Sequence, residues 1–408
     1  MPVTNFRFSN QGLTNADIDD IFINKESFSS YFPATPAGVW VWGCNAYASL
    51  GLASPLSAVV GTSSPVQNMA SGTSWNQISS AGRKMGVVKN DGTLWMWGFQ
   101  WFGALGNNIN TTTTQSSPVQ TVSTGTNWAQ VSIGGSTTGA VKTDGTLWMW
   151  GYNGSGQLGT NDRIHRSSPV QTVATGTNWR QISVGCYGVG AVKTDGTLWR
   201  WSVNGNGSLG DNSIVGKSSP VQTVATGTNW KCAVSGCGSA AGIKTDGTLW
   251  LWGFGPVLGI NNQFCLFSSP VQTIATGTNW KTIDLDKSSG SGMAVAVKTD
   301  GTLWVWGSAQ NGALGINNCD QVLSPIQTQA TGNNWRCATT AKCTVAAVKT
   351  DGTLWIWGRN NHGALGIQST TIAAISSPIQ TIATGTNWRS VSVGGADSYA
   401  PVIGALRG

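Results

Sequence analysis

The pentapeptide Asp-Gly-Thr-Leu-Trp at residues 91–95 occurs six times in this chain of 408 residues. The copies begin at Asp91, Asp144, Asp195, Asp246, Asp300 and Asp351, so the spacings are 53, 51, 51, 54 and 51 residues. A unit copied at a near-constant period of this length is typical of a solenoid or a propeller, because each copy packs only against its neighbours. The repeat therefore determines the fold, and function is to be sought in the residues that it leaves variable.

Each copy contains four segments with the pattern of short β-strands. In the second copy they are residues 117–122, 128–133, 139–143 and 146–151, which are alternating or β-branched and bounded by turn residues. The Asp-Gly pair between the last two segments predicts a two-residue hairpin turn, in which both residues have positive φ. Four antiparallel strands in each copy predict a propeller blade made of these four segments.

The tryptophans give the number of blades. A single Trp at the start of a strand recurs at Trp75, Trp128, Trp179, Trp230, Trp280, Trp335 and Trp388. A Trp-x-Trp pair recurs at Trp40/Trp42, Trp95/Trp97, Trp148/Trp150, Trp199/Trp201, Trp250/Trp252, Trp304/Trp306 and Trp355/Trp357. Both rings of a pair project from one side of a strand, so we expect them to pack between neighbouring blades. The sequence thus predicts an all-β, seven-bladed propeller over residues 38–408.

The two ends of the repeat complement each other. The last copy has strand-like segments at 378–382, 388–393 and near 399–403, and it lacks a Trp-x-Trp strand. The first Trp-x-Trp strand, residues 39–43 with Trp40 and Trp42, has no blade before it. We therefore expect residues 39–43 to join the C-terminal blade and close the ring, which removes the open sheet edges.

The net charge of +7 comes largely from residues that recur with the repeat. Lys89, Lys142, Lys193, Lys244, Lys298 and Lys349 lie two positions before the motif Asp, and Arg180, Lys231, Lys281, Arg336 and Arg389 follow the single Trp. Each Lys either pairs with the Asp two positions on, or contributes to a basic ring that attracts an acidic partner. The chain has no dense Lys/Arg run, so nucleic-acid binding is not expected.

The sequence gives no pattern of catalytic or metal-binding residues. The two histidines, His165 and His362, lie in loops of different copies with no recurring acid beside them. No Cys-x-x-Cys pair occurs, and the Gly-rich stretches lead from strand to strand and not into a helix. We therefore expect no enzyme activity, no cofactor and no metal site.

The string Trp-Gly-Tyr-Asn-Gly-Ser-Gly-Gln-Leu-Gly at 150–159, with the Ser-Pro-Val-Gln that follows it, resembles the signature of the regulator of chromosome condensation repeat family. The resemblance covers about residues 39–405. It implies a seven-bladed propeller with shared closure and one of several functions: guanine nucleotide exchange on a small GTPase, chromatin binding, or inhibition of secreted enzymes. Exchange factors of the family use an extra hairpin wedge, and no insertion of that kind is visible among the copies.

Residues 1–37 lie outside the repeat and are rich in apolar side chains. The stretch at 15–22 resembles N-terminal docking segments of virion proteins of tailed phages. The arm either packs along the propeller itself or tethers it to another protein, through Phe6, Phe8, Ile18, Ile21, Phe22, Phe28, Tyr31 and Phe32. No signal peptide and no bilayer-spanning run is present, so we expect a virion or extracellular location after assembly or lysis, or alternatively a cytoplasmic one.

Variable loops supply the remaining candidates for binding. Aromatic and Arg residues on loops of a rigid scaffold are common binding anchors, although they can also cap the blade ends. The candidates are Trp101, Phe102, Arg163, His165, Arg166, Phe264 and Phe267. The leading prediction is a structural or adhesive virion component that docks on other virion proteins through its arm and binds a host receptor or glycan through its loops. The alternative is a soluble module that inhibits or regulates a partner protein, and a GTPase exchange factor is the third.

Overall fold

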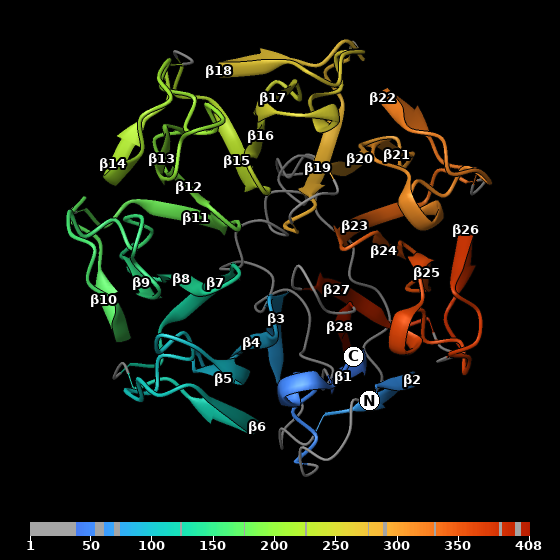
Figure 1. The fold of residues 1–408 in the computed structure, drawn as a ribbon, viewed down its shortest axis with the longest axis horizontal. Helices are drawn as coiled ribbons and strands as arrows, with labels where there is room; N and C mark the ends of the chain where they lie inside the picture. The colour runs from blue at the N-terminus through green and yellow to red at the C-terminus, as the bar shows by residue number, and fades with distance from the viewer. Residues whose placement is uncertain are drawn as a thin grey trace, which may run out of the picture.

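Seven sheets surround a central axis in the structure, a computed structural model (Figure 1). Each sheet has four antiparallel strands, and the strand nearest the axis is the one that begins with the single Trp. The structure describes residues 38–53, 61–68, 74–122, 125–174, 176–224, 227–275, 277–288, 292–329, 332–382, 386–395 and 401–408. The predicted docking arm, residues 1–37, lies outside the described residues.

Six blades are built from consecutive strands, written here from the inner to the outer strand. Blade A contains β3 (Trp75–Ala81), β4 (Lys84–Lys89), β5 (Leu94–Gln100) and β6 (Thr113–Gln120); blade B contains β7 (Trp128–Ile133), β8 (Thr137–Lys142), β9 (Leu147–Gly151) and β10 (Arg166–Gln171). Blade C contains β11 (Trp179–Val184), β12 (Gly188–Lys193), β13 (Leu198–Ser202) and β14 (Lys217–Gln222); blade D contains β15 (Trp230–Ser235), β16 (Ser239–Lys244), β17 (Leu249–Phe254) and β18 (Leu266–Gln272). Blade E contains β19 (Trp280–Leu285), β20 (Met293–Lys298), β21 (Leu303–Gly307) and β22 (Val322–Gln327); blade F contains β23 (Trp335–Ala341), β24 (Thr344–Lys349), β25 (Leu354–Arg359) and β26 (Ala374–Gln380).

The seventh blade, called the closing blade, combines both ends of the chain. Its order from the centre outward is β27 (Trp388–Gly394), β28 (Val402–Arg407), β1 (Gly38–Gly43) and β2 (Thr62–Gln67). Short 3₁₀ turns lie in four of the loops, at η1 (Ala46–Ala48), η2 (Pro256–Leu258), η3 (Gln310–Gly312) and η4 (Asn361–Gly363). The prediction that residues 39–43 close the ring is confirmed, since β1 pairs with β28 from Gly38↔Arg407 to Gly43↔Val402.

The predicted grouping of strands into blades was wrong by one strand. The Ser-Pro-Val-Gln segment at 117–120 forms the outer strand of blade A, where Gln120 pairs with Trp95, and does not belong to the blade of β7. For the same reason residues 378–380 lie in blade F, and the closing blade takes two strands from each end of the chain. The four segments recur cyclically, so their order alone fits any of four groupings, and only the pairing in space decides between them.

The Asp-Gly hairpin is confirmed, but its turn differs from the predicted one. In blade A, Gly92 has φ +76° while Asp91 does not have positive φ, and Gly92 N donates to Lys89 O at 3.0 Å. This is a turn closed by one glycine in the left-handed region, a common three-residue hairpin loop. A Cβ at Gly92 would lie 1.8 Å from Thr126 O, so the position requires glycine both for φ and for space.

The second Trp of each pair joins neighbouring blades, as predicted. Trp150 is fully buried in blade B, and its Nε1 donates to Ala104 O of the preceding blade's loop at 3.0 Å. The same bond recurs around the ring, from Trp42, Trp97, Trp201, Trp252, Trp306 and Trp357 to Ala364, Ser49, Gln157, Ser208, Val257 and Ala313 respectively. Bonding a buried indole N–H in this way satisfies a donor that would otherwise destabilise the core.

The innermost strands are also joined to one another. Gln77 of β3 both donates to and accepts from the backbone of Val131 in β7, at 2.8 and 2.7 Å. Gln130 and Gln181 repeat this pairing toward blades C and D. Blades D and F have Cys232 and Cys337 at the Gln position, so this pair of backbone hydrogen bonds is not made from those residues. Between blades E and F the inner strands are joined instead by Asp284, which accepts from Thr340 N at 3.0 Å.

Candidate interaction surfaces

The propeller has two faces that carry different parts of the repeat. The Asp-Gly hairpins and the links that lead into the single Trp lie on one face, here called the turn face, because they connect the same ends of the antiparallel strands. The hairpins between the first two strands of each blade and the long loops that follow the Trp-x-Trp strand lie on the opposite face, here called the loop face. The inner strands surround the central axis (Figure 1), and each face has a cavity there that five blades line. The axial region that contains these two cavities is called the channel.

The Asp-Gly-Thr-Leu-Trp motif is a hydrogen-bonded corner on the turn face. In blade B, Asp144 Oδ1 accepts from the backbone N–H and the hydroxyl of Thr146, at 2.9 and 2.6 Å. The Thr146 hydroxyl oxygen accepts in turn from Trp148 Nε1 at 2.8 Å. The same chain of bonds recurs at the other five copies. The motif therefore has a structural role in orienting the first Trp of each pair.

The motif lysines do not form ion pairs with the motif aspartates, contrary to the simpler of the two predictions. Lys142 Nζ lies between two indoles, 4.9 Å from the Trp128 ring centroid and 4.7 Å from the Trp148 centroid. The other five motif lysines occupy equivalent cation–π sites, and Arg407 takes this place in the closing blade. Burial alone would raise the pKa of Asp144, but the hydrogen bonds from Thr146 and the charge of Lys142 outweigh it, so this pKa lies below its ordinary value.

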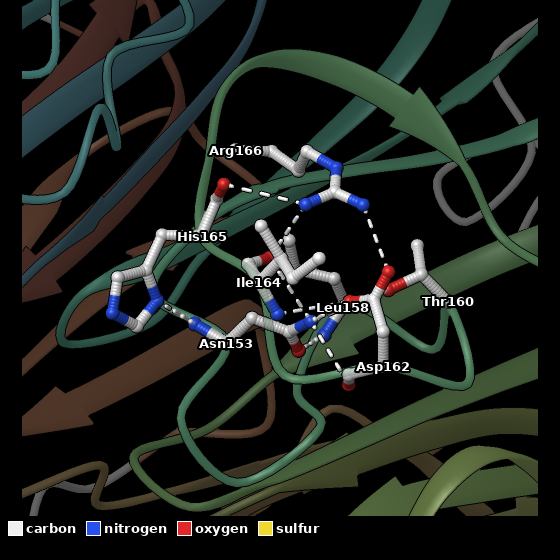
Figure 2. Close-up of polar contacts among 7 residues, drawn as sticks. All are labelled: Asn153, Leu158, Thr160, Asp162, Ile164, His165 and Arg166. Carbon is white, nitrogen blue, oxygen red and sulfur yellow. Dashed lines mark hydrogen bonds and ion pairs between the residues drawn. The ribbon is translucent and has the colours of Figure 1, made fainter.

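Two of the three polar loop candidates have partners inside their own loop (Figure 2). Asn153 is the centre of this loop, because its Nδ2 donates to Asp162 Oδ1 at 2.8 Å and its Oδ1 accepts from Leu158 N at 2.8 Å. His165 Nδ1 accepts from Asn153 N at 2.9 Å, and Arg166 forms an ion pair with Asp162 at 2.8 Å. His165 and Arg166 thus help to shape the loop, whereas Arg163 is exposed.

The aromatic candidates of blades A and B meet on the loop face. Phe102 contacts Trp101 with a centroid separation of 4.8 Å, Tyr152 at 5.0 Å and His165 at 4.4 Å. Tyr152 and His165 are themselves stacked at 4.9 Å. The structure thus brings together three residues from two loops that the sequence indicated separately.

The cluster extends into the closing blade through Phe99, which lies in the same variable segment as Trp101, and through Tyr47 and Arg83, which sequence reasoning missed. Phe99 contacts Trp101 at 6.4 Å and Tyr47 at 4.7 Å, and Arg83 lies over the Tyr47 ring at 4.2 Å. Tyr47 belongs to the loop after β1, so only the closure of the ring places it here. The contiguous set Tyr47, Phe99, Trp101, Phe102, Tyr152 and His165 is called the aromatic strip below. Trp101 is 45% exposed and the other five members are half-buried.

A cavity of about 370 Å³ adjoins the aromatic strip at the loop-face end of the channel. Its lining includes Phe99 and Trp101 from the strip, with Arg83, Lys84 and Lys287 beside them. Burial, with a smaller contribution from the charge of Arg83, lowers the pKa of Lys84 from 10.5 to about 7. A mixed aromatic and basic rim of this kind suits the recognition of protein surfaces.

The remaining two aromatic candidates do not join the strip. Phe264 is 78% exposed on the loop of blade D, away from blades A and B. Phe267 lies in the outer strand β18, opposite Gly253, and packs against the cores that blade D shares with blades C and E. Its contacts give it a packing role, and a binding role for it stays a prediction.

The described residues contain no group of three or more His, Cys, Asp or Glu side chains placed to hold a metal ion. Within the same part of the chain, no helix has the length and apolar character needed to cross a membrane. Every described strand belongs to one of the seven sheets, so these residues include no additional hairpin wedge.

Comparison with known sequences agrees with the repeat. The regulator of chromosome condensation (RCC1) repeat matches residues 91–141, 144–192, 300–344 and 351–400, and a second description of this repeat matches 128–157. The chain is 30% identical over 183 residues to the mitochondrial RCC1 domain-containing protein RUG3 of Arabidopsis thaliana, which covers 43% of this chain and 41% of that protein. It is 27% identical to the ultraviolet-B receptor UVR8 of the same plant over 286 residues, and this alignment covers 67% of this chain and 62% of the receptor. The chain thus carries RCC1 repeats and aligns with less than two thirds of either relative.

Comparison with solved structures supports the same fold. The crystal structure of Prp20p from Saccharomyces cerevisiae, described together with its binding to Gsp1p and histones, superimposes with a TM-score of 0.77. The match covers 95% of this chain and 94% of Prp20p at 15% identity. At this identity the likeness shows the fold alone.

Proposed function

We propose that this RCC1-repeat propeller is a protein-binding module that regulates or positions a partner, and that it binds this partner through the aromatic strip on its loop face. The observation that carries the proposal is the strip itself, six aromatic side chains from three blades in continuous contact. Aromatic and Arg side chains are enriched among the residues that dominate protein–protein affinity. A rigid scaffold holds them in place, so little entropy is lost when a partner binds.

The relatives favour this function over the leading prediction from sequence. The name of UVR8 is that of a receptor, and Prp20p is described with its binding to Gsp1p and histones. Neither the fold nor the comparisons favour a virion component, a prediction that rests on residues 1–37, the expected lack of a signal peptide and the weakly charged, Asn/Thr-rich composition. Location in a virion or in the cytoplasm therefore stays a prediction. An exchange-factor function is disfavoured because the described residues contain no wedge hairpin.

The proposal is tested by quantitative affinity capture from the source cell with two matched variants. Trp101→Ala removes the most exposed member of the strip, while Phe254→Ala removes an aromatic side chain of the same 45% exposure at the loop-face end of blade D. Loss of an aromatic anchor at the centre of an interface typically costs at least about 2 kcal/mol, or roughly a 30-fold loss in affinity.

We expect the wild-type protein and Phe254→Ala to recover the same stoichiometric partner, and Trp101→Ala to recover at least about tenfold less of it. Circular dichroism of both variants checks that the fold is retained. Equal recovery by all three proteins contradicts the assignment of the strip. If no stoichiometric partner is recovered at all, the proposed function itself is wrong.

A further inference from the structure

A second candidate site lies on the opposite face and begins with an irregularity of the innermost strands. In every blade the pairing of the inner strand shifts by one residue directly after the single Trp, which is the signature of a β-bulge. The residues in the seven bulges are Asn76, Ala129, Arg180, Lys231, Lys281, Arg336 and Arg389. Five consecutive blades, from C through F to the closing blade, thus place a cation at the same level of the ring. These five cations are called the basic arc.

Two members of the basic arc, Arg180 and Lys281, line the turn-face mouth of the channel. A cavity of about 470 Å³ opens at the turn-face end, and its lining comes from five different blades through Gln77, Ala129, Arg180, Cys232 and Lys281. Because five blades line this one cavity, it is the turn-face mouth of the channel and not a gap between two neighbouring blades. Its volume is in the range of small-ligand sites, so it admits a few side chains of a partner and excludes a folded domain.

The arc carries a strong excess of positive charge. Asp284 is the one acidic residue of the seven described inner strands; it is half-buried and accepts hydrogen bonds from Thr339 and Thr340 of the next blade. Burial raises the pKa of Asp284, while the charge of Lys287 and the hydrogen bonds from Thr339 and Thr340 act in the opposite direction. At the rim of the mouth, Asp144 contributes one exposed carboxylate. The six motif aspartates of the turn face are matched in number by the six motif lysines, so the five cations of the arc remain in excess over Asp284.

The arginines of the arc are held in fixed positions. Arg180 Nη2 donates to Trp230 O at 3.0 Å and to Lys231 O at 2.7 Å, both in the next blade. Arg336 makes the corresponding bonds to Trp388 O, at 2.7 Å, and to Arg389 O. Burial and then the nearby charge of Arg336 lower the pKa of Arg389, so like charges are packed together here. A channel that concentrates charge of one sign focuses its field outward and attracts an opposite charge.

From this arrangement we infer that the turn-face mouth of the channel binds an extended acidic peptide segment of a partner protein. Successive Asp or Glu side chains of such a segment meet successive cations of the arc, and guanidinium groups match carboxylates in geometry as well as in charge. The small volume favours an unfolded segment over a folded domain. The site is separate from the aromatic strip and does not depend on it.

The inference is tested by fluorescence anisotropy with a labelled peptide of ten glutamates, and a peptide of ten glutamines serves as the uncharged probe. The test variant is Lys231→Gln/Lys281→Gln, which leaves the tethered Arg180 and Arg336 intact. The matched control is Arg163→Gln/Lys217→Gln, which removes the same charge from residues that line a loop-face cavity. We expect the wild-type protein to bind the glutamate peptide, more weakly at higher salt, and the test variant to bind at least about tenfold more weakly than the control.

Trp101→Ala is included so that this site and the aromatic strip are tested separately, and it should bind the glutamate peptide as the wild type does. Equal weakening in both double variants, equal binding of the two peptides, or no binding at low salt would overturn the inference. Competition with inorganic tripolyphosphate distinguishes the class of anion. If tripolyphosphate occupies the same site ten times more tightly than the peptide, the assignment to an acidic peptide is wrong.

Discussion

Lys84 occupies a position in which a charged side chain is fully buried. Its Nζ donates to Gly134 O at 3.0 Å and to Gly135 O at 2.6 Å, so it connects blade A to blade B where other blades have Thr137, Gly188 or Ser239. Its folded-state pKa is about 7 against 10.5 for the ordinary side chain. Between these two pH values the unfolded chain binds a proton that the folded protein does not, so folding becomes more favourable as the pH rises.

The stability of the wild type relative to Lys84→Met should therefore depend on pH with a defined sign. The contribution of Lys84 is most favourable above about pH 10.5 and is lost progressively as the pH falls from there to about 7, at roughly 1.4 kcal/mol for each unit of pKa shift. Urea denaturation of both proteins between pH 6 and 10 measures the difference in unfolding free energy. A difference that stays constant over this range contradicts the burial of the charge.

Residue type and loop position predict some members of the site, but they do not predict side chains whose partners come from another blade. Trp101, Phe102 and His165 were predicted from their residue types in variable loops, and they do come together. Lys84 and Arg83 gave no signal, because their surroundings come from the next blade and from the closing blade. Arg166 was a reasonable surface candidate, but its ion pair with Asp162 depends on the path of the loop around Asn153.

The hairpin corner joins the second and third strands in six of the seven blades, and its threonine hydroxyl takes part in two of its hydrogen bonds. Thr146→Val keeps the shape of the side chain but removes one donor to Asp144 and the acceptor of Trp148 Nε1. We expect a loss of about 1–2 kcal/mol in unfolding free energy, because two hydrogen bonds of a partly buried network are lost together. The pKa of Asp144 should rise at the same time, since the Thr146 hydroxyl helps to lower it.

Thr146→Ser is the control for this element, because it retains the hydroxyl and should restore most of the stability and the low pKa. Chemical denaturation measures the first quantity, and NMR titration of the carboxyl carbon measures the second. If valine and serine behave alike, the hydroxyl does not have the proposed role.

For the strands, the sequence predicts where each strand and hairpin lies, but it does not predict which outer strand pairs with which blade. The Trp positions predicted every inner strand and every Trp-x-Trp strand, and the Asp-Gly pair predicted the hairpins, because these depend on neighbouring residues. The grouping into blades was not determined, because the outer strand reaches its partner through a long loop. In blade B that loop separates β9 from β10 by residues 152–165. Neither the turn face nor the bulges of the basic arc could be recognised without this pairing.

For the whole molecule, the closing blade is the one place where no covalent link joins two central strands. Elsewhere the second and third strands of a blade are joined by the Asp-Gly turn, whereas β28 and β1 meet through hydrogen bonds and packing alone. Trp42 and Trp201 are both fully buried and both donate to the preceding blade, at 2.8 and 2.7 Å. Trp42 in the closing blade and Trp201 in blade C are therefore equivalent positions that differ in whether a turn joins the two central strands of the blade.

Truncating either Trp to Ala should cost about 3–5 kcal/mol, but with different consequences for the ring. In Trp42→Ala we expect the amides of β1 and β28 to exchange hydrogen well before those of the other blades, because closure is lost without global unfolding. In Trp201→Ala the turn still holds β12 to β13, so the closing blade should keep its protection. Hydrogen exchange followed by mass spectrometry distinguishes the two patterns, and identical patterns would contradict the special role of the closing blade.

The pairing of Gly38 with Arg407 also determines how the ring responds to mechanical load. The start of β1 and the end of β28 lie at the same end of their sheet, so a pull that separates the two chain ends acts across the hydrogen bonds. Such a pull unzips the strands pair by pair, from Gly38↔Arg407 toward Gly43↔Val402, and does not shear all the pairs at once. We therefore expect tension between β1 and β28 to open the closing blade first, whereas in the other blades the Asp-Gly turn joins the two central strands covalently.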